Sequence, residues 1–273
     1  MAKTIKKVLF ATIVCSTVAF AGGSYAAPAA SATDEIARYR EMIADGNPSE
    51  LVAMQGEELW KTARGPKQAS LERCDLGLGP GVVKGAYARM PRYFKDVGKV
   101  QDLETRLMTC MENLQGIDPK LVVSAAWLKG EREKMAALVA YVVTESNGEK
   151  IRVDMSHPAM KRLNELGKMA FFYRGGAMDF SCATCHGDTG KRIRLQDLPD
   201  LRTHAGAAAG WGSWPAYRVS SGEFWTMQHR LNDCFRQQRF PEPVYGSEVT
   251  IALSVYLANL AKGGTMLTPG LKR

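Results

Sequence analysis

The clearest chemical motif of the sequence is Cys182-Ala183-Thr184-Cys185-His186, a CxxCH pattern. Two thiols on one helical turn can bond to the two vinyl groups of a haem, and the next residue can place its imidazole on the iron. We therefore expect Cys182 and Cys185 to anchor a covalent haem c, with His186 as its proximal ligand. The alternatives are a redox-active CxxC or half of a zinc site.

A second axial ligand for the iron has to come from elsewhere in the chain. Spacing alone does not choose among the downstream candidates, which are His204, Met227, His229, Cys234 and Met266. Met227 would make an ordinary electron carrier of high potential, whereas a cysteine thiolate donates strongly to ferric iron and lowers its reduction potential. The choice of ligand therefore decides the class of function.

The plan of the chain around the motif occurs twice. GEELW at 56–60 precedes a cysteine, much as GKMAF at 167–171 precedes CxxCH. Downstream, RLMTC at 106–110 matches RLNDC at 230–234, and an apolar segment follows each. Such internal similarity predicts two homologous halves.

The first half has lost the haem motif. Cys74-Asp75-Leu76-Gly77-Leu78 aligns with CxxCH, so glycine replaces the second cysteine and leucine replaces the histidine. We expect Cys74 and Cys110, which once faced one haem, to form a disulfide across 36 residues. Such a bridge contributes about 2–4 kcal/mol. The alternative is two unpaired buried thiols.

The repeat favours Cys234 as the distal ligand, because its counterpart Cys110 lies where a distal ligand of the lost site would be. Counting thiols agrees: of the six cysteines, Cys15 lies in the apolar run of the predicted signal peptide, two bind haem and two pair, which leaves Cys234. A buried, apolar role for this cysteine is the alternative.

Arginines near Cys234 suggest chemistry at its sulfur. The stretch 221–223 (SGE) predicts a helix start, which puts Arg230 one turn before Cys234 on the same face. A guanidinium there could bind an oxyanion by charge-assisted hydrogen bonds. Arg236 and Arg239 add positive potential, so the segment predicts an anion site.

The start of the chain predicts export. Lys3, Lys6 and Lys7 precede the apolar run 8–21, and small residues lead to Ala26, a pattern typical of a signal peptide over residues 1–26. The run is shorter than the ~20 residues of a membrane span. We expect a cleaved signal, a periplasmic location and no membrane anchor.

Composition excludes several protein classes. The 273 residues are 45% apolar and 23% charged, which is typical of globular domains and not of disordered, collagenous or coiled-coil chains. The formal net charge of +8 is spread along the sequence. Nucleic-acid binding is therefore weakly supported, and an anionic substrate or an acidic partner is at least as good an account.

The elements that position these residues are expected to be helical. Apolar periodicity predicts helices over 51–63, 131–144 and 247–261, and no run of alternating strands occurs. Turn residues at 146–148 predict a boundary near residue 150. We expect a mainly α fold of two cytochrome c-like domains, a haem-free one over 27–150 and a haem-binding one over 151–273.

With these motifs in place, the chain resembles the SoxA family, the larger subunits of the SoxAX cytochromes of bacterial thiosulfate oxidation, in a mono-haem form. The resemblance extends over the sequence after the signal and includes the CxxCH motif, the cysteine pair of the first half and RLNDCFR at 230–236. Gly77 and Leu78 depart from the di-haem relatives, so a role for a second haem does not carry over.

The resemblance implies an L-cysteine S-thiosulfotransferase, which couples thiosulfate oxidatively to a cysteine of the carrier SoxYZ. Electrons would pass to cytochromes through the haem of a SoxX-like partner in a heterodimer. Cys234 would be the catalytic cysteine, which can be a persulfide in the family, and Arg230 would bind the sulfonate end of thiosulfate. The chemistry needs a nucleophilic sulfur and an adjacent electron acceptor.

The competing function is a non-enzymatic periplasmic electron carrier with Met227 or His229 as distal ligand. A cytochrome c peroxidase of two domains is disfavoured, because it needs two CxxCH motifs and this chain has one.

Overall fold

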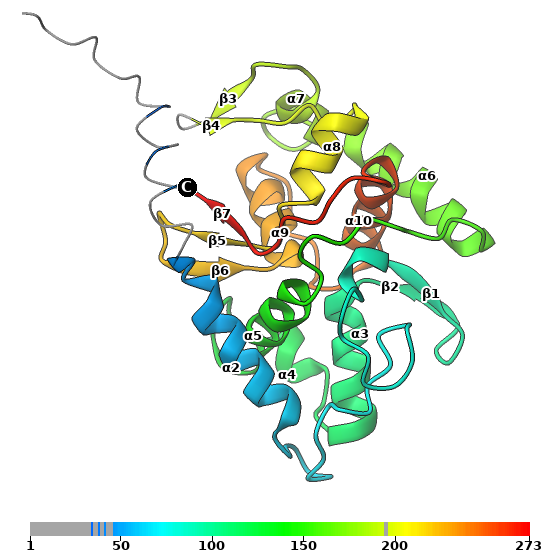
Figure 1. The fold of residues 1–273 in the computed structure, drawn as a ribbon. Coiled ribbons are helices and arrows are strands. Elements are labelled where there is room, and N and C mark those ends of the chain that lie inside the picture. Colours follow the sequence, from blue (N-terminus) through cyan, green and yellow to red (C-terminus); the bar gives the residue numbers. More distant parts are fainter. Residues whose placement is uncertain (1–33, 35–37, 39–40, 42–45, 194–195) are drawn as a thin grey trace, which may run out of the picture.

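The computed structural model describes residues 34, 38, 41, 46–193 and 196–273, and the structural statements below concern these residues. The predicted signal peptide, residues 1–26, lies outside them. The fold is mainly helical, with short strands at its edges (Figure 1). Within the described part, no helix has the length and apolar character needed to cross a membrane.

The elements follow one another along the chain as a first and a second set. The first set consists of α2 (Ser49–Lys61), the 3-10 turn η2 (Tyr87–Arg89), β1 (Arg92–Phe94), β2 (Lys99–Gln101), α3 (Leu103–Cys110), the π-helical turn η3 (Met111–Gln115), α4 (Lys120–Val123) and α5 (Gly130–Thr144). The second set consists of α6 (Pro158–Phe172), α7 (Cys182–His186), β3 (Arg192–Ile193), β4 (Gln196–Asp197), α8 (His204–Trp211), β5 (Ala216–Arg218), β6 (Glu223–Trp225), α9 (Met227–Gln237), α10 (Glu248–Leu260) and β7 (Gly270–Lys272).

Two helix pairs pack in the same way, as the internal repeat predicts. Helix α2 packs on α5, and α6 packs on α10 (Figure 1). A Cβ atom on Gly56 would lie 1.9 Å from the carbonyl oxygen of Ala137, and one on Gly167 would lie 2.0 Å from that of Ala252. Only glycine lets the two backbones approach so closely.

An aromatic contact accompanies each crossing. The ring of Trp60 lies 6.1 Å from that of Tyr141, and the ring of Phe171 lies 5.5 Å from that of Tyr256. Both pairs are tilted, at 57° and 49°. The two copies of the sequence plan therefore build the same local packing.

Helices α3 and α9 also correspond. Each follows an antiparallel hairpin, β1–β2 or β5–β6, and each begins after a capping side chain. Asp102 accepts a hydrogen bond from the backbone N–H of Thr105 at 2.9 Å, and Thr226 accepts one from His229 at 3.2 Å. In the second set, β7 adds to β5 in parallel.

The expected helix start at 221–223 is wrong. Gly222 has a positive φ of 68° and lies in the turn between β5 and β6, and Glu223 opens β6. Helix α9 begins at Met227, after the capping residue Thr226. A Ser-Gly-Glu sequence suits a hairpin turn as well as a helix start, and pairing with β5 decides between them. The sequence shows no run of alternating strands, and these short hairpins were not predicted from it.

The three long helices expected from periodicity are present, as α2, α5 and α10. The chain passes from the first set to the second at residues 148–151, which run beside 263–266. There Ile151 donates its N–H to the carbonyl of Gly264 at 2.9 Å. The expected domain boundary near residue 150 stays a prediction.

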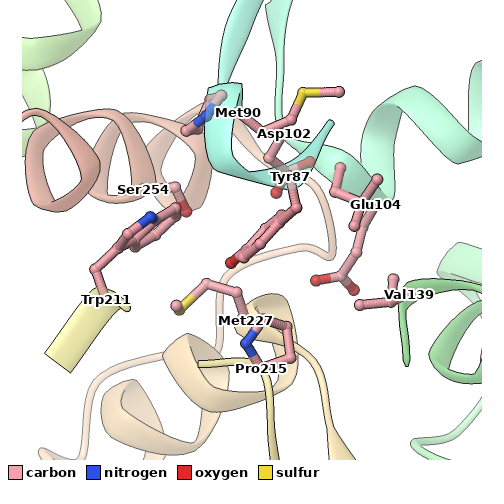
Figure 2. A pocket seen from close by; sticks show the side chains of 11 residues that line it. Tyr87, Met90, Asp102, Glu104, Val139, Trp211, Pro215, Met227 and Ser254 are labelled. Atoms are coloured by element: carbon pink, nitrogen blue, oxygen red, sulfur yellow. The ribbon is translucent and has the colours of Figure 1, made fainter. Parts of the chain in front are cut away.

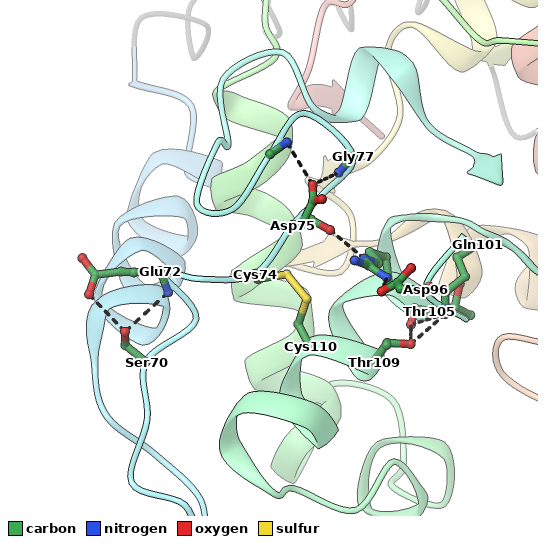
Figure 3. Close-up of a disulfide and its surroundings, with 12 residues drawn as sticks. Ser70, Glu72, Cys74, Asp75, Gly77, Asp96, Gln101, Thr105, Thr109 and Cys110 are labelled. Atoms are coloured by element: carbon green, nitrogen blue, oxygen red, sulfur yellow. Dashed lines mark hydrogen bonds and ion pairs between the residues drawn. A yellow bond between two sulfur atoms is a disulfide. The ribbon is translucent and has the colours of Figure 1, made fainter. Parts of the chain in front are cut away.

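A disulfide joins Cys74 and Cys110, the pair expected from the sequence, with their Cα atoms 5.5 Å apart (Figure 3). Both residues are buried. Beside the bridge, Arg106 donates from Nε to the carbonyl oxygen of Asp75 at 2.6 Å and pairs with Asp96 at 2.7 Å. The bridge therefore ties the loop after α2 to the end of α3.

We predict that Gly167→Ala destabilises the protein by about 1–3 kcal/mol, because the added methyl forces α6 and α10 apart. This cost outweighs the gain of about 1 kcal/mol in helix propensity. Urea unfolding measures the difference. Gly46→Ala is the control, because no atom lies within 4 Å of its Cβ position. Equal stability of the two variants would contradict the packing argument.

The double substitution Cys74→Ala with Cys110→Ala is expected to lower the free energy of unfolding by about 2–4 kcal/mol, since the bridge restricts the unfolded chain. The haem absorption spectrum should not change, because neither Cys74 nor Cys110 lines the cavity beside the CxxCH motif. Urea unfolding and an absorption spectrum test both parts, and a loss of haem in the variant would argue against this separation.

Candidate functional site

Helix α7 carries the CxxCH motif and is held at its start by a capping box. Ser181 Oγ accepts a hydrogen bond from the N–H of Thr184 at 3.1 Å, and Thr184 Oγ1 accepts one from the N–H of Ser181 at 2.9 Å. The N–H groups of Ser181 and Thr184 both have a hydrogen-bond acceptor, and this capping stabilises the start of a helix of only five residues. Cys182 and Cys185 are both free thiols and half-buried.

The imidazole of His186 is oriented by a backbone carbonyl. Its Nδ1 lies 3.1 Å from the carbonyl oxygen of Pro199, which can only accept, so Nδ1 carries the proton. The other nitrogen, Nε2, is then left with its lone pair for a metal. Burial lowers the pKa of His186 below its ordinary value, which favours the neutral ring that a metal ligand needs.

A cavity of about 520 Å³ lies beside this helix. Its size is that of a cofactor site. Side chains of α7, α8, β5, α9 and α10 line it, among them Cys182, Cys185, His186, Trp211, Arg218, Arg230, Cys234, Leu253 and Leu257. Two free thiols, one imidazole with a free Nε2 and mainly apolar walls fit a covalently bound haem.

Cys234 lines the same cavity from the middle of α9 and is half-buried. Burial raises the pKa of its thiol, while the positive charges of Arg230 and Arg218 act in the opposite direction. A metal ion beside a thiol removes its proton. A metal ion bound beside Cys234 would therefore favour the thiolate form of its side chain.

The other distal candidates differ in position. Met227 also lines the cavity. His229 is stacked between Trp127 and Trp225, at ring distances of 4.2 and 4.0 Å, and burial lowers its pKa to about 4. The ring of His229 is thus stacked against two tryptophans.

The remaining two candidates are bound elsewhere. The Nε2 of His204 lies 2.9 Å from the carbonyl oxygen of Lys262 at the surface. Met266 is fully buried in the core. Of the five candidate ligands, Cys234 and Met227 therefore remain, because both line the cavity that His186 also lines.

The predicted anion residue Arg230 lines the cavity and is held in place. Its Nη1 lies 3.2 Å from Oδ2 of Asp233, and its guanidinium carbon lies 5.4 Å from the ring centre of Trp214. Arg236 pairs with the same carboxylate but is exposed, and Arg239 is exposed in the following turn. Of the three arginines, Arg230 alone is among the residues that line the cavity.

Sequence reasoning missed other residues of the site. Arg218 on β5 and Lys272 on β7 are paired in register across neighbouring strands, and both line the cavity. Neither lies in a motif, and their contribution depends on a sheet whose strands are far apart in sequence. Pro199 and Asp233, which orient His186 and Arg230, were missed because only contacts in the fold assign them.

Asp233 stabilises the end of the site electrostatically. Burial raises the pKa of its carboxyl, but hydrogen bonds and charge from Arg236, Arg230 and Gln237 outweigh burial and hold the pKa below 3.8. This stabilisation is therefore present above that ordinary value and is lost as the pH falls through the folded-state pKa.

We predict that Asp233→Asn lowers the free energy of unfolding at neutral pH by about 1–3 kcal/mol. The variant should also lose part of the decrease in melting temperature that the natural protein shows toward acid pH. Melting curves from about pH 3 to 7 measure both effects. Asp179→Asn, which removes the exposed pair with Arg174, is the control and should change little. Identical curves for all three proteins would refute the assignment.

Comparison with known proteins gives consistent results. Residues 55–151 match the family model described as SoxA/TsdA, cytochrome c domain. The L-cysteine S-thiosulfotransferase subunit SoxA of Hydrogenophilus thermoluteolus is 65% identical over 96% of this chain and 98% of its own length. The protein with the same name from Hydrogenobacter thermophilus is 39% identical over 83% of this chain and 82% of its own.

A solved structure agrees in fold. The crystal structure of SoxXA from P. pantotrophus matches with a TM-score of 0.69 and 25% identity, over 83% of this chain and 79% of that one. Identity of 65% over nearly the full length leaves no ambiguity about descent. The chain belongs to the SoxA family.

Proposed function

We propose that the chain is the catalytic subunit of a periplasmic L-cysteine S-thiosulfotransferase, which couples thiosulfate oxidatively to a cysteine of a SoxYZ-like carrier. The relatives that match over most of the chain bear this enzyme name. The observation that carries the proposal is the placement of Cys234 and Arg230 in one cavity with the CxxCH helix. That placement joins a reactive sulfur, an anion-binding cation and a haem attachment motif.

The haem belongs to the second of two cytochrome c-like domains, over 151–273, and the first, over 27–150, binds none. All four histidines of the chain, at 157, 186, 204 and 229, follow residue 150. In the first half Cys74 and Cys110 are joined to each other, so neither thiol can bind haem or iron. One haem c is therefore expected, on Cys182 and Cys185.

His186 and Cys234 would be the axial ligands. A bound haem would supply a one-electron acceptor for this sulfur chemistry, and the two electrons of the reaction would leave one at a time to a partner cytochrome. The protein residues bind and orient the reactants, as His186 is fixed by Pro199 and Cys234 by its helix.

The reaction balances as an oxidative coupling at Cys234. The thiolate of Cys234 and the outer sulfur of thiosulfate (S₂O₃²⁻) form a sulfur–sulfur bond, which gives Cys234–S–S–SO₃⁻ and releases two electrons. The thiolate of the carrier cysteine then attacks the bound sulfur that bears the sulfonate. This step gives carrier–S–S–SO₃⁻ and returns Cys234 as a thiolate.

Arg230 would bind the sulfonate end of thiosulfate during this reaction. The guanidinium of Arg230 forms an ion pair with Asp233, so its orientation is fixed before an anion binds. The positive charge of Arg218 also acts on the Cys234 thiol, and it would attract the same anion. The dianion of the substrate is thereby attracted to the sulfur with which it reacts.

The partners follow from the same proposal. A SoxX-like cytochrome with one haem would form the heterodimer, and the residues 1–26 would direct export to the periplasm. The haem-free first domain is available for contacts with the partner subunit.

We predict that Cys234→Met keeps a covalent haem but abolishes thiosulfate coupling, because a thioether cannot form the sulfur–sulfur bond. Arg230→Ala should lower kcat/KM for thiosulfate about 10²-fold, a typical loss for a charge pair with substrate. Steady-state turnover with the carrier protein measures both. Arg162→Ala, at an exposed arginine of α6 that pairs with Glu248 and does not line the cavity, is the control and should retain most activity.

Absorption spectra of the same variants distinguish the enzyme from an electron carrier. A thiolate-ligated haem is expected in the natural protein. A methionine-to-iron absorption band there, lost in Met227→Leu, together with no thiosulfate coupling by the natural protein, would replace the enzyme with an electron carrier that uses Met227.

A further inference from the structure

A small, mainly apolar cavity of about 10 Å³, the size of one water molecule, lies between the two halves (Figure 2). Trp211 and Met227 line both this cavity and the large one, so the two spaces are neighbours. From the first half, Asp102 and Glu104 face the small cavity (Figure 2). Two buried carboxyl groups thus lie directly behind the candidate site.

Glu104 contacts the first turn of α9 although it belongs to α3. Its Oε1 accepts a hydrogen bond from the backbone N–H of Gln228 at 2.9 Å. The first N–H groups of a helix have no partner within the helix, so this contact satisfies a donor that would otherwise be buried and unpaired. Glu104 is 2% exposed and Gln228 is fully buried.

The side chain of Gln228 makes a second bond to the first half. Its Nε2 donates to Oδ2 of Asp102 at 2.6 Å, while its Oε1 accepts from the N–H of Gly246 at 3.2 Å. One turn later, Asn232 donates to the carbonyl oxygen of Gln228 at 3.0 Å. The beginning of α9 is therefore fixed in position by polar contacts on several sides.

An aromatic contact from the first half adds to this hold. Trp127, between α4 and α5, stacks on His229 with an interplanar angle of 4°. Arg132 of α5 places its guanidinium 4.4 Å from the ring centre of Trp127 and 4.7 Å from that of Tyr245. The hydroxyl of Tyr245 in turn donates to Oε2 of Glu104.

We propose that Glu104 is a positioning residue for α9, through which the haem-free half holds Arg230 and Cys234 at the distance from His186 that the reaction needs. Gln228 lies six residues before Cys234, so about 9 Å of continuous helix transmits its position to the sulfur. The inference rests on the proposed function of Cys234. It gives the first half a role in the site besides any contact with a partner subunit.

The groups around Glu104 make this hold depend on pH. Asp102 on α3, Tyr87 on η2, Tyr245 before α10 and Arg132 on α5 all interact with it electrostatically. Burial, and then the charge of Asp102, raise the pKa of Glu104 to about 8. The neutral acid keeps both bonds, because Oε1 still accepts from Gln228 and Oε2–H can donate to Tyr245.

Above this pKa Glu104 ionises. Its negative charge then lies beside that of Asp102, which weakens the contacts that fix the start of α9. Between the ordinary value of 4.5 and about 8, the folded protein binds a proton that the unfolded chain does not. The contribution of Glu104 to stability is therefore largest below 4.5 and falls as the pH rises through this window.

The test compares Glu104→Gln and Glu104→Ala in the haem-loaded protein with its partner subunit. Glutamine can accept from Gln228 and donate to Tyr245 at every pH, so it imitates the neutral acid. Glu112→Gln, at an exposed glutamate just after α3, is the matched control. The measurements are kcat and KM for thiosulfate, melting temperature from about pH 5 to 9, and the low-spin ferric EPR signal of the haem.

We expect Glu104→Ala to lower kcat about 10–100-fold with KM little changed and to alter the EPR signal, since Cys234 moves relative to the iron. Glu104→Gln should keep the kcat and EPR signal of the natural protein near pH 7. It should also lack that protein's decrease in kcat and melting temperature toward pH 8, which the control retains.

The proposal is overturned if Glu104→Gln keeps the natural pH profiles, or if Glu104→Ala leaves kcat and the EPR signal unchanged. If Glu104→Ala does not fold, the profiles of Glu104→Gln decide. If the natural protein couples no thiosulfate, the proposed function fails, and the EPR and melting measurements still show whether Glu104 positions α9.

Discussion

A backbone contact at one glycine in each half determines how the rest of the structure is arranged. Gly56 and Gly167 let a helix approach the carbonyl group of the helix it crosses, and no larger residue fits there. In the second half, this contact fixes α10 against α6, and α10 supplies Leu253 and Leu257 to the cavity wall. Because α6 leads directly toward the CxxCH helix, the same contact sets both the motif and the wall opposite to it.

The two halves share this framework but differ in their sulfur chemistry. By the internal repeat, Cys74 corresponds to Cys182 and Cys110 to Cys234. In the first half the two sulfurs are bonded to each other, and apolar side chains such as Leu76 and Leu107 are fully buried around them. In the second half the corresponding thiols are free and line a cavity. The same sequence plan therefore gives a buried disulfide in the first half and a cavity lined by free thiols in the second.

Much of the site could be predicted from sequence because its chemistry is local or repeated. CxxCH is contiguous, and the match of Cys110 with Cys234 follows from two similar segments. The start of α9 could not be predicted, since pairing of β6 with β5 converts the expected helix start into a hairpin. Arg218, Pro199 and Trp127 depend on contacts between distant segments, which leave no pattern in a single sequence. His229 was an open candidate until its stacking partners were known.

The buried carboxyl groups between the halves are the feature that the shared framework does not explain. Burying two acids costs free energy that an apolar pair would avoid. Asp102 and Glu104 nevertheless lie at the N-terminus of α9, where the first N–H groups have no partner within the helix and a partial positive charge favours acidic partners. Under the proposed function, the sulfur of Cys234 would both bind iron and react, so it would have to move, and a helix whose first turn is fixed would confine that motion to the side chain. On that proposal, the free-energy cost of the buried acids is offset by a fixed start of the helix that carries Cys234.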